Sequence, residues 1–357
     1  MLSAVHSYSM NLIDCDIHNN IPDADAIGKY LSGRWKRHYE QFGMRYYFSG
    51  GYYHRSHASA ARDDAWPPNG NIPASDLPFL QEQLLDHWNI DIGILNTLYP
   101  AGEQSNRAYG AALAPAINEW ILRDWLEPEP RLRASIVVPY EDGHDAAAEI
   151  NRWADDPRFI QIALVARTQE PMGRRKYWPM YEAAAEHDLP LGMHFGGAPG
   201  LPITGAGYPS YYFEDHCGMP QAFQAQIISM VFEGVFERFP TLKLVLIEGG
   251  FAWLPSLMWR MDRAWEKLGS EVPEVKRPPS DYIRKHCWFT TQPMEEPSQG
   301  KFFHQMLESI DMNDHIMFAT DYPHWDFDAP DQAFPVKIDK TLRRKIMAEN
   351  AQQLYKL

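Results

Sequence analysis

The stretch LIDCDIHNN, residues 12–20, decides between two folds in which strands and helices alternate. Its first part, Leu12–Ile17, predicts a buried strand, because the apolar run is short and is bounded by polar residues. An open, doubly wound sheet would carry a glycine-rich GxGxxG turn directly after this strand. His18, Asn19 and Asn20 stand there instead, so the stretch favours a closed barrel over the open sheet.

Seven later runs of the same kind predict seven further strands. They are Asp91–Thr97, Arg133–Val138, Phe159–Val165, Pro190–Phe195, Leu242–Ile247, Cys287–Thr291 and Ile316–Thr320. Nearly continuous apolar strands are what a parallel sheet covered on both faces requires, and helical patterns lie between these runs. Strand and helix repeated about eight times indicate a single domain, residues 1–357, folded as an α/β protein of the (β/α)₈ TIM-barrel type. The doubly wound sheet is the alternative.

The composition argues against several classes of function. The formal net charge is −14 and no basic block is present, so binding to nucleic acid or to an acidic membrane surface is not expected. The three cysteines lie far apart without a CxxC pair, which suits a reduced, cytoplasmic protein better than a disulfide scaffold. The sequence shows neither a signal-peptide pattern nor an apolar run long enough to span a bilayer.

Two long segments interrupt the alternation of strands and helices. Residues 30–75 are rich in Tyr, His, Gly, Pro and Arg, and residues 196–218 are rich in Gly, Pro and Tyr. Both follow a strand end, on the face where barrel enzymes build their active sites, so we expect both to be loops above the site. Plain surface insertions are the alternative.

Polar residues mark the carboxyl ends of four predicted strands, which meet at one mouth of a barrel. Asp16 and His18 end the first strand, His194 ends the fifth, Glu248 follows the sixth and Asp321 follows the eighth. Each has a plainer explanation when taken singly, such as a core histidine, a helix cap or a carboxylate bonded to nearby backbone amides. Taken together, nitrogen and oxygen ligands of this kind indicate a site for Zn, Mn or Fe.

Alternation along the first strand predicts where its side chains point. A period of two places Asp14, Asp16 and His18 on one face, and it turns Cys15 and Ile17 into the layer between barrel and helices. We therefore expect Asp16 and His18 to be an inward pair of metal ligands.

Several longer motifs resemble the amidohydrolase superfamily, in the branch that contains aminocarboxymuconate semialdehyde decarboxylase. The motifs are DCDIHNN, MHFGG, FPTLKLVLIEGGFAWLPSLMWRMD, FTTQPMEEP and FATDYPHWDFD, and the resemblance covers nearly the whole chain. It implies a (β/α)₈ barrel with a divalent metal at its mouth, held by Asp16, His18, His194 and Asp321. Zn is the first choice of metal, with Mn or Fe as alternatives and a two-metal site as a variant.

Two positions depart from the pattern of this branch. Asp16 replaces the first histidine of the usual HxH pair, which makes the site more anionic and favours Mn or Fe somewhat over Zn. Glu248 stands where the decarboxylases commonly carry a histidine that serves as proton donor or base. The fourth strand, FIQIALV, also lacks the lysine that bridges two metals in binuclear amidohydrolases, so a lysine-bridged pair is not expected.

Three mechanisms fit these residues and a small carboxylate-bearing substrate. In metal-assisted hydrolysis, Asp321 takes the proton of a metal-bound water and Glu248 passes it to the leaving group. In nonoxidative decarboxylation, Glu248 or Asp321 protonates the substrate carbon. The third follows from resemblance to a few relatives that are nonheme iron oxygenases with two metals, including a two-subunit hydroxylase of α-disubstituted amino acids. Glu248 and His216 would then hold a second metal.

Four further residues are candidates for contact with the substrate. His54 and His57 lie in the first long segment, Gln292 follows the seventh strand and His324 follows the eighth. The resemblance also implies an oligomer, made of one kind of chain or of two. A metal-holding subunit without catalytic activity is the alternative to an enzyme.

Overall fold

Eight parallel strands form one sheet in this computed structural model, which describes residues 11–44, 60–99, 101–197 and 204–357. The strands are β1 (Ile13–Ile17), β2 (Ile92–Leu95), β3 (Leu132–Val137), β4 (Phe159–Val165), β5 (Leu191–His194), β6 (Leu244–Ile247), β7 (Cys287–Thr290) and β8 (Ile316–Met317). Each strand pairs with the next one along the chain. The two ends of the sheet also meet, because Cys15 N donates to Phe318 O at 3.0 Å. The predicted (β/α)₈ barrel is confirmed, and the doubly wound alternative is wrong.

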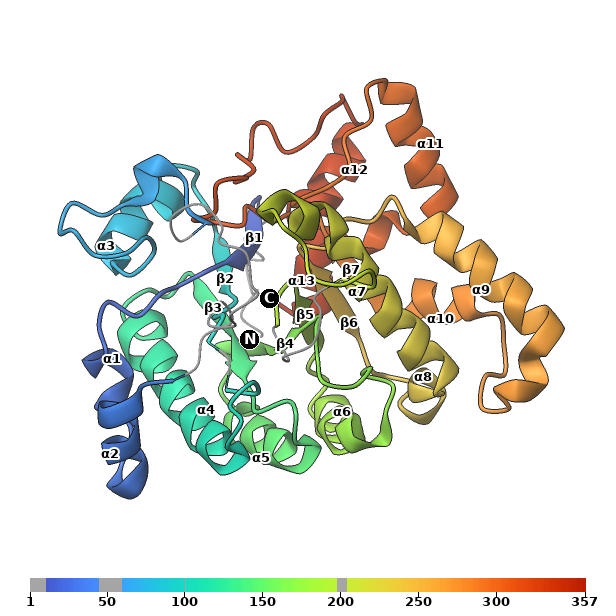
Figure 1. The fold of residues 1–357 in the computed structure, drawn as a ribbon. Helices are drawn as coiled ribbons and strands as arrows, with labels where there is room; N and C mark the ends of the chain where they lie inside the picture. Colours follow the sequence, from blue (N-terminus) through green and yellow to red (C-terminus); the bar gives the residue numbers. More distant parts are fainter. Residues whose placement is uncertain (1–10, 45–59, 100, 198–203) are drawn as a thin grey trace, which may run out of the picture.

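Most of the helices surround the strands on the outside of the barrel (Figure 1). The α-helices are α1 (Asp25–Gly28), α2 (Gly33–Phe42), α3 (Leu77–Leu80), α4 (Arg107–Ile121), α5 (Gly143–Trp153), α6 (Trp178–Glu186), α7 (Tyr212–Phe232), α8 (Val235–Arg238), α9 (Leu254–Leu268), α10 (Pro279–His286), α11 (Gly300–Ile310), α12 (Lys340–Arg344) and α13 (Asn350–Tyr355). Asp76, Asn106 and Asp142 cap the starts of α3, α4 and α5, since each side chain accepts a hydrogen bond from a first-turn amide. Among the described helices, none is long and apolar enough to cross a bilayer.

The two loops predicted above the barrel are shorter than expected. Helix α2 occupies Gly33–Phe42 inside the first, and α7 begins at Tyr212, inside the second. Helix α7 starts this early because the Glu214 carboxylate accepts hydrogen bonds from two backbone amides ahead of the helix. The first segment still reaches the barrel mouth, where Arg62 N donates to Pro323 O at 3.0 Å.

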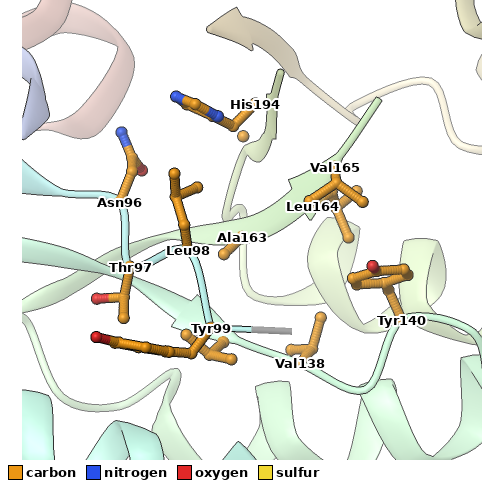
Figure 2. A pocket seen from close by; sticks show the side chains of 12 residues that line it. Asn96, Thr97, Leu98, Tyr99, Val138, Tyr140, Ala163, Leu164, Val165 and His194 are labelled. Atoms are coloured by element: carbon orange, nitrogen blue, oxygen red, sulfur yellow. The ribbon is translucent and has the colours of Figure 1, made fainter. Parts of the chain in front are cut away.

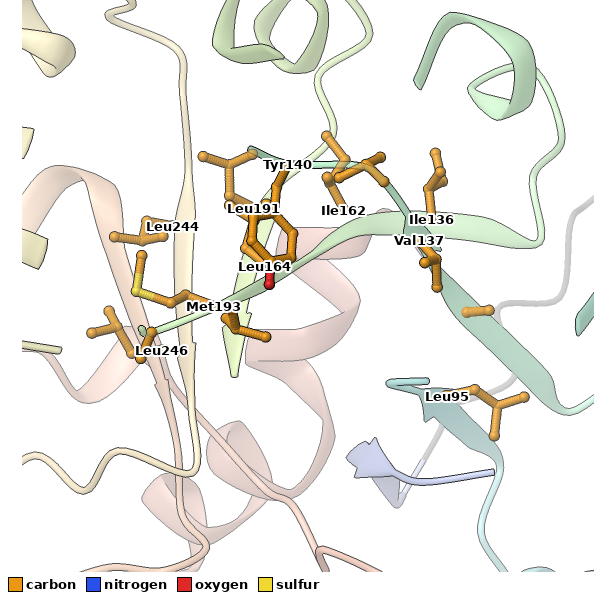
Figure 3. Packing of buried hydrophobic residues seen from close by; sticks show 14 of the residues in the cluster. Leu95, Ile136, Val137, Tyr140, Ile162, Leu164, Leu191, Met193, Leu244 and Leu246 are labelled. Atoms are coloured by element: carbon orange, nitrogen blue, oxygen red, sulfur yellow. The ribbon is translucent and has the colours of Figure 1, made fainter. Parts of the chain in front are cut away.

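Two apolar clusters build the core. The larger one fills the layer between the strands and the surrounding helices, where Leu191, Leu244 and Leu246 pack (Figure 3). The smaller one contains the alternate residues of the same strands, such as Val245 and Ile247, and therefore faces the inside of the barrel.

Strand β1 departs from the regular alternation predicted from the sequence. Its pairing with β2 shifts register between Asp14 and Ile17, and such an irregularity changes the face on which the next residues lie. Cys15 lies in the inner cluster with Ile13, so the expectation that it faces the helices is wrong. Ile17 lies in the outer cluster as predicted, so the alternation changes face between Cys15 and Ile17. Asp14 turns to the neighbouring strand end, where its carboxylate accepts a hydrogen bond from Thr320 N at 2.9 Å.

Candidate metal centre

Four predicted side chains converge at the barrel mouth. Asp16 and His18 lie at the end of β1, His194 ends β5 and Asp321 follows β8. One ligand atom of each lies within 4.8 Å of the others, and all four residues are buried. His18 Nε2 is 2.8 Å from Asp321 Oδ1, and His194 Nε2 is 3.3 Å from Asp16 Oδ2. The structure therefore brings together the four residues predicted to be metal ligands.

Neighbouring groups determine which ligand atoms face the centre. A carbonyl oxygen can only accept, so His18 Nδ1 donates to Asn96 O, at 2.8 Å, and His194 Nδ1 donates to Phe195 O. Each imidazole then keeps its Nε2 lone pair for a metal. Asn96 Nδ2 donates to Asp16 Oδ1 at 2.8 Å, which leaves Oδ2 of that carboxylate for the centre.

The atoms turned toward the centre fit a cation. Within the described parts of the chain, Asp16 Oδ2, His194 Nε2 and Asp321 Oδ2 are buried atoms without a hydrogen-bond partner. A buried polar atom left unpaired costs about 1–3 kcal/mol, and more when it is charged. One divalent cation would satisfy all three atoms at once. Two imidazoles and two carboxylates suit Mn²⁺, Fe²⁺ or Zn²⁺ and suit Ca²⁺ poorly, because Ca²⁺ takes oxygen ligands.

Glu248 and Asp321 both adopt a left-handed backbone conformation. Their φ angles are 62° and 59°, directly after β6 and close to the end of β8. A conformation of this kind costs a residue other than glycine about 1–3 kcal/mol, and such strain concentrates at functional sites. Glu248 Oε2 lies 3.1 Å from His194 Nε2, so this carboxylate belongs to the site.

The charges at the mouth are arranged as a cation site requires. Burial, followed by the negative charges of Asp321 and Asp326, raises the pKa of Glu248 well above its ordinary range. Burial lowers the pKa of His18, but Asp16 and Asp321 more than offset this and raise it to about 9. Protons on these groups balance part of the buried negative charge when no metal is present. A metal held by His18 would take over part of that role and would displace the proton of this imidazole. Glu248 is not one of the four central ligands, so it can keep its proton.

A second group of ligand-type side chains adjoins the first. His216 of α7, Glu248 and Asp326 offer atoms within 4.8 Å of one another. His216 Nε2 lies 3.0 Å from Asp326 Oδ2. Glu248 also has an atom within 4.8 Å of one on Asp321, so it lies between the two groups. The structure thus brings His216 and Glu248 together, as the two-metal variant expects, and it adds Asp326.

His324 contacts two of the four central residues. Its Nδ1 is 2.7 Å from Asp321 Oδ1, and its ring stacks on the His18 ring with centroids 4.6 Å apart. These contacts orient Asp321 and His18, and they keep His324 at the mouth, where it was predicted to contact a substrate.

The other substrate-binding candidates have different outcomes. Gln292 Nε2 donates to Asp326 O at 3.0 Å, so this side chain holds the segment that carries Asp326. His54 and His57 lie outside the described residues.

A pocket that is partly open to solvent lies beside the metal group. His194 and Asn96 lie toward one end, and Tyr99 and Val138 lie toward the other (Figure 2). The remaining lining is mostly apolar: Thr97, Leu98, Val137, Tyr140, Ala163, Leu164, Val165 and Gly192. A mostly apolar lining with a few polar groups at one end suits a small ring-bearing ligand.

Two residues of the site were not predicted. Asn96 lies in the predicted strand Asp91–Thr97, as a polar residue at a strand end, which is the signal that identified Asp16. Asp326 lies in the motif WDFD, where the sequence offers no reason to prefer it over Asp328. Asn96 could therefore have been found from the sequence, whereas Asp326 required the path of the chain after β8.

The fold and this centre define a metal-dependent enzyme built on a (β/α)₈ barrel. The chain belongs to the amidohydrolase family, whose model matches residues 13–357. This confirms the family predicted from the strand-end motifs.

Three similar proteins are decarboxylases. The decarboxylase orsB of Emericella nidulans is 23% identical over 260 residues, which are 68% of this chain and 72% of that protein. The structure of a 2,6-dihydroxybenzoate decarboxylase complexed with 2,6-dihydroxybenzoate matches with a TM-score of 0.69 and 21% identity, covering 98% of this chain and 100% of that one. The 5-carboxyvanillate decarboxylase of Novosphingobium aromaticivorans, complexed with manganese and 4-hydroxy-3-methoxy-5-nitrobenzoic acid, matches with a TM-score of 0.71 and 18% identity, covering 98% and 96%. These two structures share the barrel fold with this chain.

Proposed function

We propose that the protein is a metal-dependent, nonoxidative decarboxylase of a small aromatic carboxylate, with Mn²⁺ as its metal. One observation carries the proposal: the group of unpartnered ligand atoms shares His194 with a pocket walled by Leu98, Val138 and Val165. Two carboxylates among the ligands favour Mn²⁺ over the Zn²⁺ expected first. The activities and the manganese of the similar proteins support the same choice.

Different residues of the protein have different roles in this reaction. A metal held by Asp16, His18, His194 and Asp321 would supply positive charge to polarise the oxygens of the substrate. Leu98, Val138 and Val165 keep the ring in a pocket of low polarity beside the metal group. As the bond from the ring carbon to the carboxylate breaks, its electron pair stays on that carbon and CO₂ leaves. Glu248 then gives a proton to the same carbon.

An assay of CO₂ release tests the proposal. The purified protein is stripped of metal with a chelator, reloaded with Mn²⁺ and given a series of hydroxybenzoates, while CO₂ release and oxygen uptake are followed together. We expect CO₂ release that depends on Mn²⁺ and is not accompanied by oxygen uptake. Cleavage of esters or amides of these acids without CO₂ release would identify a hydrolase instead.

The second ligand group supports a second candidate function, oxygenation at a two-metal centre. Glu248 lies between the two groups, and a carboxylate in such a position can bridge two metal ions. His216 and Asp326, 3.0 Å apart, would hold the second ion. This is also the arrangement implied by the resemblance to two-metal oxygenases, in which the chain could be one subunit of two.

The number of metal ions per chain separates the two candidates. A mononuclear decarboxylase binds one ion, and H216A and D326N leave that number unchanged. A two-metal oxygenase binds two iron-group ions and consumes oxygen with its substrate, and each variant lowers the number to one. Elemental analysis of all three proteins, together with oxygen uptake, measures the difference. Bound metal without turnover of any acid or amino acid would favour a metal-holding subunit.

A further inference from the structure

A chain of buried hydrogen bonds crosses the inside of the barrel from α13 to Asp16. Tyr355 Oη donates to Gln161 Oε1 at 2.6 Å. Gln161 Nε2 donates to Asn96 Oδ1 at 3.1 Å, and Asn96 Nδ2 donates to Asp16 Oδ1 at 2.8 Å. All four side chains are buried. Tyr355 packs in the inner cluster with Ile13, at the start of β1, so the chain spans the barrel from the end opposite to the mouth.

Every donor in this chain points toward the metal group. A phenol that keeps its proton donates to the Gln161 carbonyl, and burial raises the pKa of Tyr355 well above its ordinary value of 10.0. The Gln161 carbonyl is then occupied, so its amide group donates onward to Asn96. Ser135 reinforces this direction, because its Oγ accepts from Gln161 Nε2 at 2.9 Å and donates to Asn96 Oδ1 at 2.6 Å. Hydrogen bonds aligned in this way polarise and strengthen one another.

The absence of a side chain at Gly192 leaves room for this chain of hydrogen bonds. A Cβ atom at this position of β5 would lie 2.3 Å from Gln161 Nε2. That approach is shorter than any ordinary contact, so a larger residue would push the Gln161 amide out of line. The barrel interior is therefore shaped around an extended Gln161 side chain.

Asn96 connects this chain of hydrogen bonds to two of the predicted metal ligands. Its amide group holds Asp16 Oδ1, and its backbone carbonyl accepts from His18 Nδ1. If the side-chain amide of Asn96 were flipped, its oxygen would face the Asp16 carboxylate and repel it. The geometry points to Tyr355 and Gln161 as positioning residues of the metal centre: they hold the Asn96 amide in the orientation that leaves Asp16 Oδ2 free for the cation. This inference rests on the proposed metal site but not on the reaction.

Metal affinity tests the inference without any substrate. The variants are Y355F, which removes only the hydroxyl, and N96A, which removes the last link. The matched control is Y181F, because Tyr181 is also buried and donates its hydroxyl to a backbone carbonyl, Met172 O, at 2.6 Å. The dissociation constant for Mn²⁺ is measured by titration, and the spectrum of the bound ion is recorded by electron paramagnetic resonance.

We expect N96A to weaken Mn²⁺ binding by about 10–100-fold, as the loss of partners that orient metal ligands does. Y355F, three links away, should weaken binding by about 3–10-fold and alter the Mn²⁺ spectrum, and its effect should vanish when N96A is already present. Y181F should bind Mn²⁺ as the unaltered protein does, even if all three variants melt at lower temperatures.

Equal Mn²⁺ affinity and equal spectra in Y355F and Y181F would overturn the inference and leave the proposed reaction standing. Failure of the unaltered protein to bind Mn²⁺ would overturn both. The expected shifts in affinity, combined with an absence of CO₂ release, would overturn only the proposed reaction.

Discussion

H194A is expected to weaken Mn²⁺ binding by more than about a hundredfold, because it removes a ligand rather than a partner that only orients one. His194 provides one of the unpartnered buried atoms of the centre, and it also lies 3.1 Å from Glu248 and lines the pocket. The unaltered protein should gain about 4 kcal/mol of stability when Mn²⁺ is present at a thousand times its dissociation constant. The variant should gain almost nothing at the same concentration. Isothermal titration and thermal unfolding with and without Mn²⁺ measure the two effects.

The matched control for this variant is H286A. His286 is equally buried, and its Nδ1 donates to Leu242 O at 2.7 Å, but it belongs to neither group of ligands. Its replacement should lower the unfolding temperature and leave the stabilisation by Mn²⁺ intact. An H194A protein that still gained the full stabilisation from Mn²⁺ would show that the metal binds elsewhere.

The strand ends could be predicted from the sequence because two simple signals coincide there. Short apolar runs locate the eight strands, and the polar residues that end four of these runs locate the mouth. Asp16, His18, His194 and Asp321 were found in this way, and the structure brings all four together. Parallel strands place their carboxyl ends at one edge of the sheet for any conformation of the loops. The convergence of these four residues can therefore be predicted without knowledge of the loops.

The parts that the sequence did not predict depend on local backbone geometry. The irregularity in β1 puts Cys15 and Ile17 on opposite faces of the strand, and a strict period of two cannot anticipate it. Asp326 lies beside Glu248 after the chain has turned at Asp321, which has a positive φ. The link from Tyr355 to Asp16 joins residues from opposite ends of the sequence through the barrel core. Residues that far apart in the sequence share no periodic pattern from which their contact could be predicted.

Glu248 combines several unusual properties in one residue. It adopts a left-handed backbone conformation, it is buried among carboxylates, and it stands where similar decarboxylases were expected to carry a histidine. The left-handed backbone and the burial among carboxylates both cost stability, so a purely structural role would not favour a glutamate here. The functional roles that remain are those of a proton donor and of a metal ligand, and they predict different results for one substitution.

E248Q is expected to lower the turnover number about 10²–10⁴-fold while the protein keeps its Mn²⁺, because the amide retains the size of the side chain but has no acidic proton to give. The control is E149Q. Glu149 is a buried carboxylate on α5 that accepts from Asn118 Nδ2 at 2.9 Å, so its loss should cost stability but not turnover. Turnover is followed as CO₂ release at saturating substrate, and metal content by elemental analysis of the same samples. If E248Q turned over as fast as E149Q, the proton would have to come from another residue. If instead it lost one of two bound metals, Glu248 would be a bridging ligand and the two-metal oxygenase would become the better description of the site.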